Sequence, residues 1–130
     1  MAVTTTTQPR ANESLDAPVH IGTVSLRVRD LPGLTVFYRD AIGLSVISEN
    51  ERESVLGAGG VPLVRLEAGA QAPSSAAGLF HLALLLPSRA DLANWLGHAA
   101  GRRLPLEGAS DHLVSEALYL SDPEGNGIEI

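Results

Sequence analysis

The chain contains two copies of one strand-then-helix sequence pattern, and the two copies align without a gap at an offset of 58 residues. The first copy is HIGTVSLRVRDLPGLTVFYRDAIGL from His20, and the second is GLFHLALLLPSRADLANWLGHAAGR from Gly78. Apolar positions recur between the copies while polar positions differ, which indicates that two modules keep one core architecture. The recurring pairs are Leu26 with Leu84, Val28 with Leu86, Leu34 with Leu92, Phe37 with Trp95 and Gly43 with Gly101.

The first copy predicts a strand, a helix and three further strands. Apolar and polar residues alternate over residues 21–29, which is typical of a half-buried strand. Asp30 can cap the helix that follows, Pro32 suits its first turn and Gly43 ends it. Short strands are then expected at residues 44–49, 52–57 and 61–67, between Gly-rich and polar turns.

The second copy repeats this order after AGAQAPSSAAG, residues 68–78, whose composition predicts a flexible linker. We expect a strand over residues 79–87, a helix capped by Ser88 with Asp91 and ended by Gly101, and strands near 109–113, 115–121 and 126–130. The predicted fold class is α+β, with paired β-α-β-β-β modules. Residues 1–17 are predicted to be a disordered tail and 18–130 one domain, made of module one (18–67), the linker and module two (79–130).

Composition excludes several classes of function. The absence of cysteine rules out disulfides, zinc-thiolate sites and thiol catalysis. A net charge of −6 with scattered basic residues disfavours binding to nucleic acid, which requires clustered Lys and Arg. No apolar run is long enough to span a bilayer, and the first residues do not resemble a signal peptide, so we expect no membrane association and a cytoplasmic location.

Two motifs are distinctive: Leu-x-Val-x-Asp-Leu followed by Phe-Tyr-Arg-Asp and Gly-Leu, and the ending Asp-Pro-Glu-Gly-Asn-Gly-Ile-Glu-Ile. They resemble the motifs of the vicinal oxygen chelate superfamily, which contains glyoxalase I, bleomycin-resistance proteins and extradiol ring-cleaving dioxygenases. The resemblance covers nearly everything from His20 onward, and the second half looks most like the amino-terminal domain of catechol 2,3-dioxygenases. It implies two modules curled into an incomplete barrel around a cleft.

The resemblance also implies where a metal would be bound. Its four ligand positions fall at Thr23, Arg65, His81 and Glu129, of which only the last two are metal-binding types. A non-haem Fe(II) dioxygenase requires two His and one carboxylate, so we predict no tightly bound cofactor, with Fe(II) or another divalent metal as the alternative. We also predict an ion pair between Arg65 and Glu129 that satisfies the carboxylate without metal.

Each candidate residue has an ordinary structural alternative. A lone histidine such as His81 is more often a structural residue hydrogen-bonded within a sheet than a metal ligand. A carboxylate such as Glu129 is more often solvated or ion-paired. Tyr119 lies ten residues before Glu129, the spacing at which ring-cleaving relatives carry a substrate-contacting tyrosine, but a strand tyrosine is ordinarily a packing residue. His112 is a candidate acid or base, or an exposed loop histidine.

Basic residues suggest one further feature of the cleft. Arg27 and Arg29 continue the cleft-facing side of the first strand, and with Arg65 they predict a basic wall that receives a carboxylate or phenolate. The alternative is a solvated strand end.

Three functions remain open from the sequence. The first is a metal-deficient module of the catechol dioxygenase type that acts with a partner, either a second copy or a second vicinal oxygen chelate domain, or that serves as a cleft for a small aromatic molecule. The second is a binding protein of the bleomycin-resistance type that sequesters its ligand without turnover. The third is a metalloenzyme whose missing ligand comes from a neighbouring chain. In every case we predict a homodimer, or pairing with a second such domain, because the curled modules leave strand edges uncovered.

Overall fold

The computed structural model describes residues 22–71 and 79–130 and has two sheets of four strands each. The first sheet has the order β1-β4-β3-β2 and the second β5-β8-β7-β6, so the two modules repeat one topology. In module one, the elements are β1 (Val24–Val28), α1 (Leu31–Phe37), the π-helical turn η1 (Tyr38–Ile42), β2 (Ser45–Glu49), β3 (Glu53–Ala58) and β4 (Val61–Ala68). In module two, they are β5 (Leu82–Ala83), α2 (Arg89–Gly101), β6 (Gly108–Asp111), β7 (Glu116–Ser121) and β8 (Gly127–Glu129). The predicted α+β class and the paired modules are therefore confirmed.

Both helices begin and end near the predicted residues. Asp30 accepts a hydrogen bond from the Gly33 amide at the start of α1, and Ser88 accepts one from the Asp91 amide at the start of α2. Gly43 ends η1 in the left-handed conformation, with φ of 96°, where a residue with a side chain is strained.

The prediction of a strand over residues 79–87 is wrong in extent, because β5 comprises only Leu82 and Ala83. These residues pair in parallel with Ile128 and Glu129 of β8, and the Leu84 amide donates to the Glu129 carbonyl at 2.8 Å. The segment that follows Leu84 is not in strand conformation, and Pro87 within it has no amide to donate. The predicted tail and residues 72–78 of the predicted linker lie outside the described residues, while residue 68 belongs to β4.

One apolar core extends through both modules. Its most buried members come from helices and strands of both modules, and they include Val28, Leu34, Tyr38, Leu56, Val64, Leu66, Ala99, Leu120 and Ile128. Burial of this apolar surface is the main stabilising term for a chain of this size.

Polar contacts join the modules around the core. The buried Tyr38 hydroxyl donates to the Asp122 carboxylate at 3.1 Å, and the Trp95 indole N–H donates to the Ile42 carbonyl at 2.9 Å. Glu124 accepts hydrogen bonds from the Arg29 and Asp30 amides, at 2.8 Å each. These contacts hold the turn between β7 and β8 against the start of α1.

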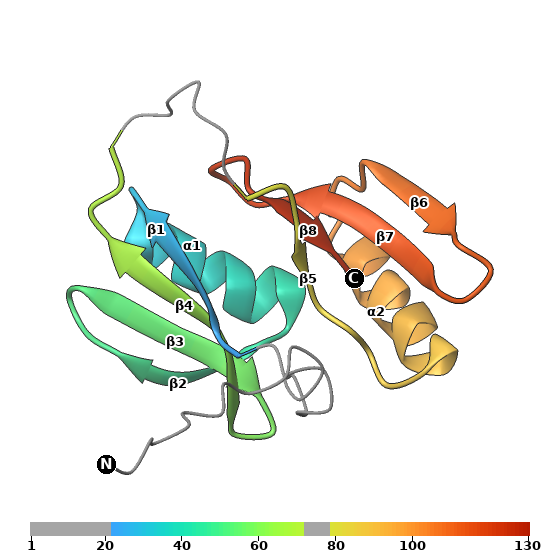
Figure 1. Cartoon of the computed structure of the whole chain (residues 1–130), viewed down its shortest axis with the longest axis horizontal. Coiled ribbons are helices and arrows are strands. Elements are labelled where there is room, and N and C mark those ends of the chain that lie inside the picture. The colour runs from blue at the N-terminus through green and yellow to red at the C-terminus, as the bar shows by residue number, and fades with distance from the viewer. Residues whose placement is uncertain (1–21, 72–78) are drawn as a thin grey trace, which may run out of the picture.

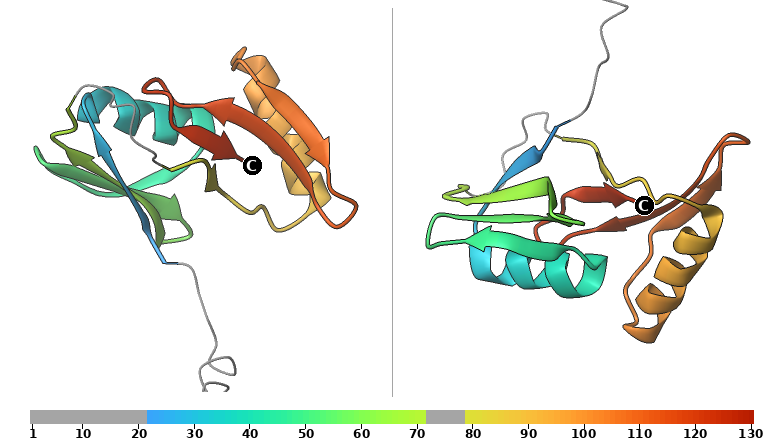
Figure 2. Two further views of the ribbon diagram at one scale, coloured as in Figure 1. Left: turned by 45° about the horizontal axis from the view of Figure 1, so that its top comes forward. Right: turned by 90° about the horizontal axis from the view of Figure 1, so that it is seen from below.

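The two helices cover the same side of the molecule and leave the other face of both sheets open (Figures 1 and 2). Figure 1 looks onto this face, which we call the open face, and the two sheets do not close into a barrel there. Within the two described ranges, no helix has the length and apolar character needed to cross a membrane.

Candidate functional site

The strand pairing decides which candidate residues share a face. Leu26, Val28, Val64 and Leu66 are buried beneath α1, so the alternating residues Ser25, Arg27, Arg65 and Glu67 lie on the open face. In the second sheet, Leu82, Leu120 and Ile128 are buried towards the helix side, so His81, Tyr119 and Glu129 lie on the open face. All the candidates named from the strands therefore project from the same side of their sheets.

The predicted Arg65–Glu129 ion pair is wrong. Arg65 donates to the Glu53 carboxylate at 2.7 Å, within its own sheet. Glu53 lies on the neighbouring strand β3, two residues from Val55, the register partner of Arg65. A diagonal partner on an adjacent strand is within reach of a long side chain, whereas Glu129 belongs to the other sheet.

His81, Gly127 and Tyr119 form a compact group on the second sheet. The ring centroids of His81 and Tyr119 are 5.3 Å apart, although β8 lies between the strands that carry them. Gly127 lies directly beneath the imidazole, because a Cβ built on it would come within 2.8 Å of His81 Cδ2. The absence of a side chain at Gly127 thus permits the contact between the two rings.

Tyr119 connects the remaining candidates. Its hydroxyl lies 3.1 Å from His112 Nε2, and Tyr119 is the register partner of Glu129. Desolvation and then the nearby Glu129 carboxylate raise the pKa of the Tyr119 phenol above its ordinary value. The phenol therefore remains protonated at neutral pH and keeps a proton that it can donate.

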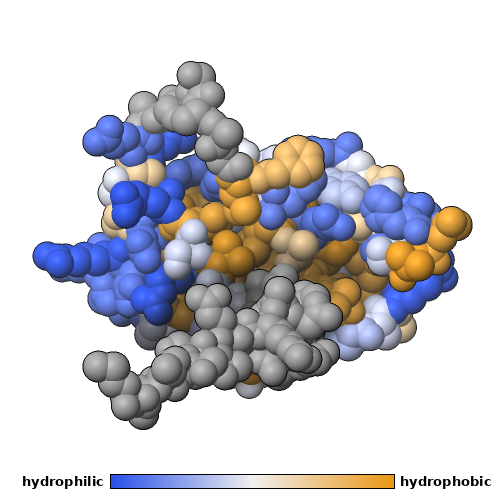
Figure 3. All heavy atoms as spheres, viewed as in Figure 1, coloured by the Kyte–Doolittle hydropathy of each residue, from blue (hydrophilic) through white to orange (hydrophobic). Residues whose placement is uncertain are grey.

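Phe80 extends this group and was not singled out by the sequence. Its ring centroid lies 4.0 Å from that of His81, and 83% of the residue is exposed. The signal was its place next to His81 in an apolar run, which the sequence analysis assigned to a strand over residues 79–87. The open face seen in Figure 3 has apolar side chains gathered between the two sheets and polar residues over the first sheet. We call Phe80, His81, His112, Tyr119 and Glu129 the aromatic–carboxylate cluster.

The predicted basic wall is not uniformly basic. Arg27 lies opposite Glu67 in the β1–β4 register, and Arg65 is paired with Glu53. Arg29 lies at the end of β1, where its Nε is 3.6 Å from Glu124. Carboxylates therefore compensate these cations, which weakens any attraction for an anionic ligand.

The four positions that the resemblance implies do not provide a metal site. The Thr23 hydroxyl donates to the Pro62 carbonyl at 3.3 Å, and the Arg65 guanidinium introduces a fixed positive charge. Only His81 and Glu129 carry groups that bind metals, and non-haem iron requires three protein ligands of this kind. Among the described residues, no three His, Cys, Asp or Glu side chains are grouped so that they could hold a metal ion. The donor groups of the described residues therefore do not fit non-haem Fe(II).

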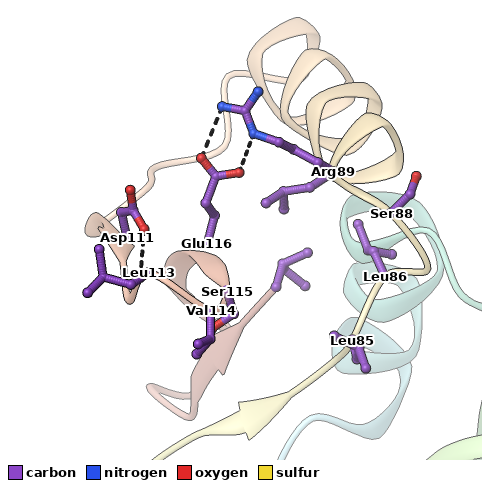
Figure 4. Close-up of a pocket in the computed structure, with 11 residues that line it drawn as sticks. Leu85, Leu86, Ser88, Arg89, Asp111, Leu113, Val114, Ser115 and Glu116 are labelled. Atoms are coloured by element: carbon purple, nitrogen blue, oxygen red, sulfur yellow. Dashed lines mark hydrogen bonds and ion pairs between the residues drawn. The ribbon is translucent and has the colours of Figure 1, made fainter.

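A pocket lies elsewhere on the second sheet. It has a volume of about 500 Å³ and is lined by the residues before α2, by Arg89 and Leu92, by the β6–β7 turn and by Ile130 (Figure 4). None of the cluster residues lines it. The candidate site is therefore an open surface on the face opposite the helices.

Comparisons with known proteins agree with this architecture. Residues 20–130 match the model of the Glyoxalase/Bleomycin resistance protein/Dioxygenase superfamily. A catechol-2,3-dioxygenase of Bacillus subtilis (strain 168) is 40% identical over 122 residues, which cover 90% of this chain but only 42% of that protein. The chain thus spans less than half the length of this relative.

Solved structures share the fold at low sequence identity. Lactoylglutathione lyase from Agrobacterium tumefaciens aligns with a TM-score of 0.69 at 23% identity, over 86% of this chain and 92% of that one. A fosfomycin resistance protein from Listeria monocytogenes aligns with a TM-score of 0.62 at 11% identity, over 87% and 92% of the two chains.

Proposed function

Because the chain belongs to the glyoxalase/bleomycin resistance protein/dioxygenase superfamily, we propose that it is a dioxygenase-type module that binds a small phenolic molecule on the open face of its second sheet. In this proposal the chain does not hold a catalytic metal by itself and acts together with a partner, a second copy or a second domain of the same superfamily. The similarity to part of a catechol-2,3-dioxygenase supports the choice of a phenol.

The observation that carries the proposal is the contact of His81 with Tyr119 beside Glu129. Phe80 and the adjacent rings of His81 and Tyr119 offer apolar surface for one face of an aromatic ligand. Glu129 is half-buried and accepts hydrogen bonds, so it favours a ligand that carries hydroxyl donors. The Tyr119 hydroxyl supplies a second hydrogen-bonding group.

The charges of the cluster predict selectivity between ligands of similar size. Glu129 disfavours an anion, and the arginines of the first sheet are already compensated by Glu53, Glu67 and Glu124. A neutral catechol should therefore bind more tightly than benzoate, which carries its charge at neutral pH.

Titration of the full chain with catechol, followed by NMR, tests the proposal. We expect saturable shifts of the His81 and Tyr119 resonances, with a dissociation constant on the order of 0.1–1 mM for so small a ligand. Tyr119→Phe and His81→Ala should each weaken binding about fivefold or more. Arg39→Ala, which removes an exposed partner of Asp40 in the first module, is the matched control and should leave binding unchanged. Equal binding of catechol and benzoate, or no effect of either site variant, would refute the proposal.

A further inference from the structure

A groove lies between α2 and the strands β6 and β7, on the helix side of the second sheet. It has a volume of about 370 Å³, which is in the range of small-molecule sites. One wall is formed by residues 109–111 of β6 and 116–118 of β7. The other wall is one stripe of α2 with the spacing i, i+3, i+4 and i+7, formed by Arg89, Leu92, Ala93 and Leu96. We call this space the α2 groove.

The internal repeat shows that the corresponding space in module one is filled. The four positions that precede the α2 stripe by 58 residues are only 0–6% exposed, and they are Leu31, Leu34, Thr35 and Tyr38. In α2, Leu96 stands in place of the tyrosine and is 41% exposed, and Ala93 stands in place of the threonine and is also exposed. The smaller side chains of module two therefore leave the space between helix and sheet open.

The body of the α2 groove presents apolar side chains rather than backbone groups. Ala109 and Leu118 are register partners on β6 and β7, and Leu118 lies on the same side of the sheet as the buried Leu120. The amides and carbonyls of these strands bond to one another in the plane of the sheet, so they are not available to an added strand. Ile130 does not line the groove, and β8 lies across β7 from β6, so the line of β8 does not enter it.

Carboxylates lie at the end of the groove where α2 begins. Asp111 and Glu116 lie directly opposite each other on β6 and β7. Arg89 donates to Glu116 at 2.5 and 3.0 Å, as Figure 4 shows, whereas Asp111 forms no ion pair with another described residue. Two carboxylates and one guanidinium leave one negative charge at this end, which attracts a cation.

We propose that the α2 groove binds a small amphiphile of the alkylammonium class, which has an unbranched apolar body and a cationic end. The body lies along the stripe of α2, whose ends are about 10 Å apart at a rise of 1.5 Å per residue, and contacts Leu92, Leu96 and Leu118. The ammonium group lies between Asp111 and Glu116 and neutralises the remaining charge. This site is on the opposite side of the sheet from the aromatic–carboxylate cluster, and the inference does not depend on the function proposed for that cluster.

Methyl NMR of the full chain with n-octylammonium as the probe tests the proposal. We expect saturable shifts of the Leu92, Ala93 and Leu96 methyl groups, with a dissociation constant on the order of 0.1–1 mM. Octanoate has a similar body and the opposite charge, so it should bind at least about tenfold more weakly, with 1-octanol between the two. Propylammonium lacks most of the apolar body and should also bind at least about tenfold more weakly. Equal binding of octylammonium and octanoate would overturn the proposal, whatever the stability of any variant.

Protein variants give an independent comparison. Ala93→Leu fills the groove from a helix position that favours leucine, and it should weaken octylammonium binding about tenfold or more. Ala90→Leu is the matched control, because Ala90 is exposed on α2 and does not line the groove. Asp111→Asn keeps an acceptor for the Leu113 amide but removes the charge, so octylammonium should bind about three- to fivefold more weakly and 1-octanol as before. Equal losses for these two ligands in Asp111→Asn would overturn the proposal.

Other occupants and another site are distinguished by the same spectra. Shifts of the groove methyl groups that grow with protein concentration, without probe, would assign the groove to a second copy and overturn the proposal. Shifts of His81 and Tyr119 in place of the groove methyl groups would assign the probe to the aromatic–carboxylate cluster and overturn it as well. Saturation with catechol should leave the affinity for octylammonium unchanged, because the two sites lie on opposite sides of the sheet.

Discussion

Gly127 lies so close beneath His81 that a Cβ at this position would come 2.8 Å from the imidazole Cδ2 and 2.5 Å from the Phe80 carbonyl oxygen. The backbone contact cannot be relieved by a rotamer change, because the Phe80 carbonyl is part of the chain that leads into β5. The glycine therefore fixes both the path of this segment and the position of the His81 ring against Tyr119.

Gly127→Ala should accordingly destabilise the protein by about 1–3 kcal/mol, the usual cost of forcing an extra methyl group into a packed site. Urea unfolding measures this change, and NMR should show that the His81 ring has moved away from Tyr119. Gly97→Ala is the matched control, because Gly97 lies in α2 with open space around its Cβ position. That variant should be neutral or more stable by up to about 1 kcal/mol. Similar losses in both variants would contradict the account of Gly127.

We expect the protein to lose stability at alkaline pH because the Tyr38 hydroxyl is buried beside the Asp122 carboxylate. Desolvation and then the Asp122 carboxylate hold the pKa of Tyr38 well above its ordinary value of 10.0. Above pH 10 the unfolded chain loses this proton while the folded chain keeps it, so the folded state binds more protons and stability falls as pH rises. Below pH 10 the contribution of Tyr38 to the free energy of unfolding is fully present.

Tyr38→Phe should reduce this fall between pH 9 and 11, as measured by urea unfolding at each pH. At neutral pH the variant should lose about 1–2 kcal/mol, because Asp122 then lacks one hydrogen-bond donor. If the free energy of unfolding of Tyr38→Phe falls with pH as much as that of the unsubstituted protein, groups other than Tyr38 cause the fall. The same measurement on Tyr119→Phe gives the contribution of the second tyrosine.

Trp95 reports on the packing of α2 against the first module. Its indole N–H donates to the Ile42 carbonyl at the end of η1, and His98 Nε2 lies 3.1 Å from the Asp40 and Ala41 carbonyls. Trp95→Phe keeps an aromatic ring but leaves the Ile42 carbonyl without this donor. We expect a loss of about 1–3 kcal/mol in thermal unfolding followed by circular dichroism. A loss below about 0.5 kcal/mol would mean that the two modules do not depend on this contact.

The repeat at an offset of 58 residues predicts both modules, and residues such as Asp30, Gly43 and Ser88 predict the ends of the helices because these signals are local. The partner of Arg65 could not be predicted in this way. It depends on the register between β3 and β4, which places Glu53 diagonally from Arg65 and shifts between Leu56 and Gly57. The extent of β5 likewise depends on its pairing with β8. Of the candidate site, the sequence predicts His81, His112, Tyr119 and Glu129 as candidates, but the role of Gly127 requires knowledge of which strand lies between the two rings.

We expect the chain to self-associate because its sheets have unpaired strand edges. β2 and β6 each have an unpaired edge within the described sheets, and strand edges promote pairing with a second copy. We expect a homodimer in sedimentation velocity at about ten micromolar, well above the dissociation constants typical of specific interfaces. Val36→Ala, which removes an exposed apolar side chain from α1 and leaves the residues of both edge strands unchanged, should not change the sedimentation coefficient. A monomer at this concentration would contradict the prediction.

Metal content is the remaining prediction, and it follows from the donor set. His81 and Glu129 provide two ligands, while Arg65 provides none and the Thr23 hydroxyl donates to the Pro62 carbonyl. We therefore expect the purified chain to contain much less than one equivalent of iron, manganese or zinc in elemental analysis. His81→Ala should leave this low content unchanged, as should Glu107→Gln, a control at an exposed carboxylate outside the cluster. One tightly held equivalent that is lost in His81→Ala but kept in Glu107→Gln would show that a metal site forms despite this donor set. Such a result would favour a third ligand from a neighbouring chain.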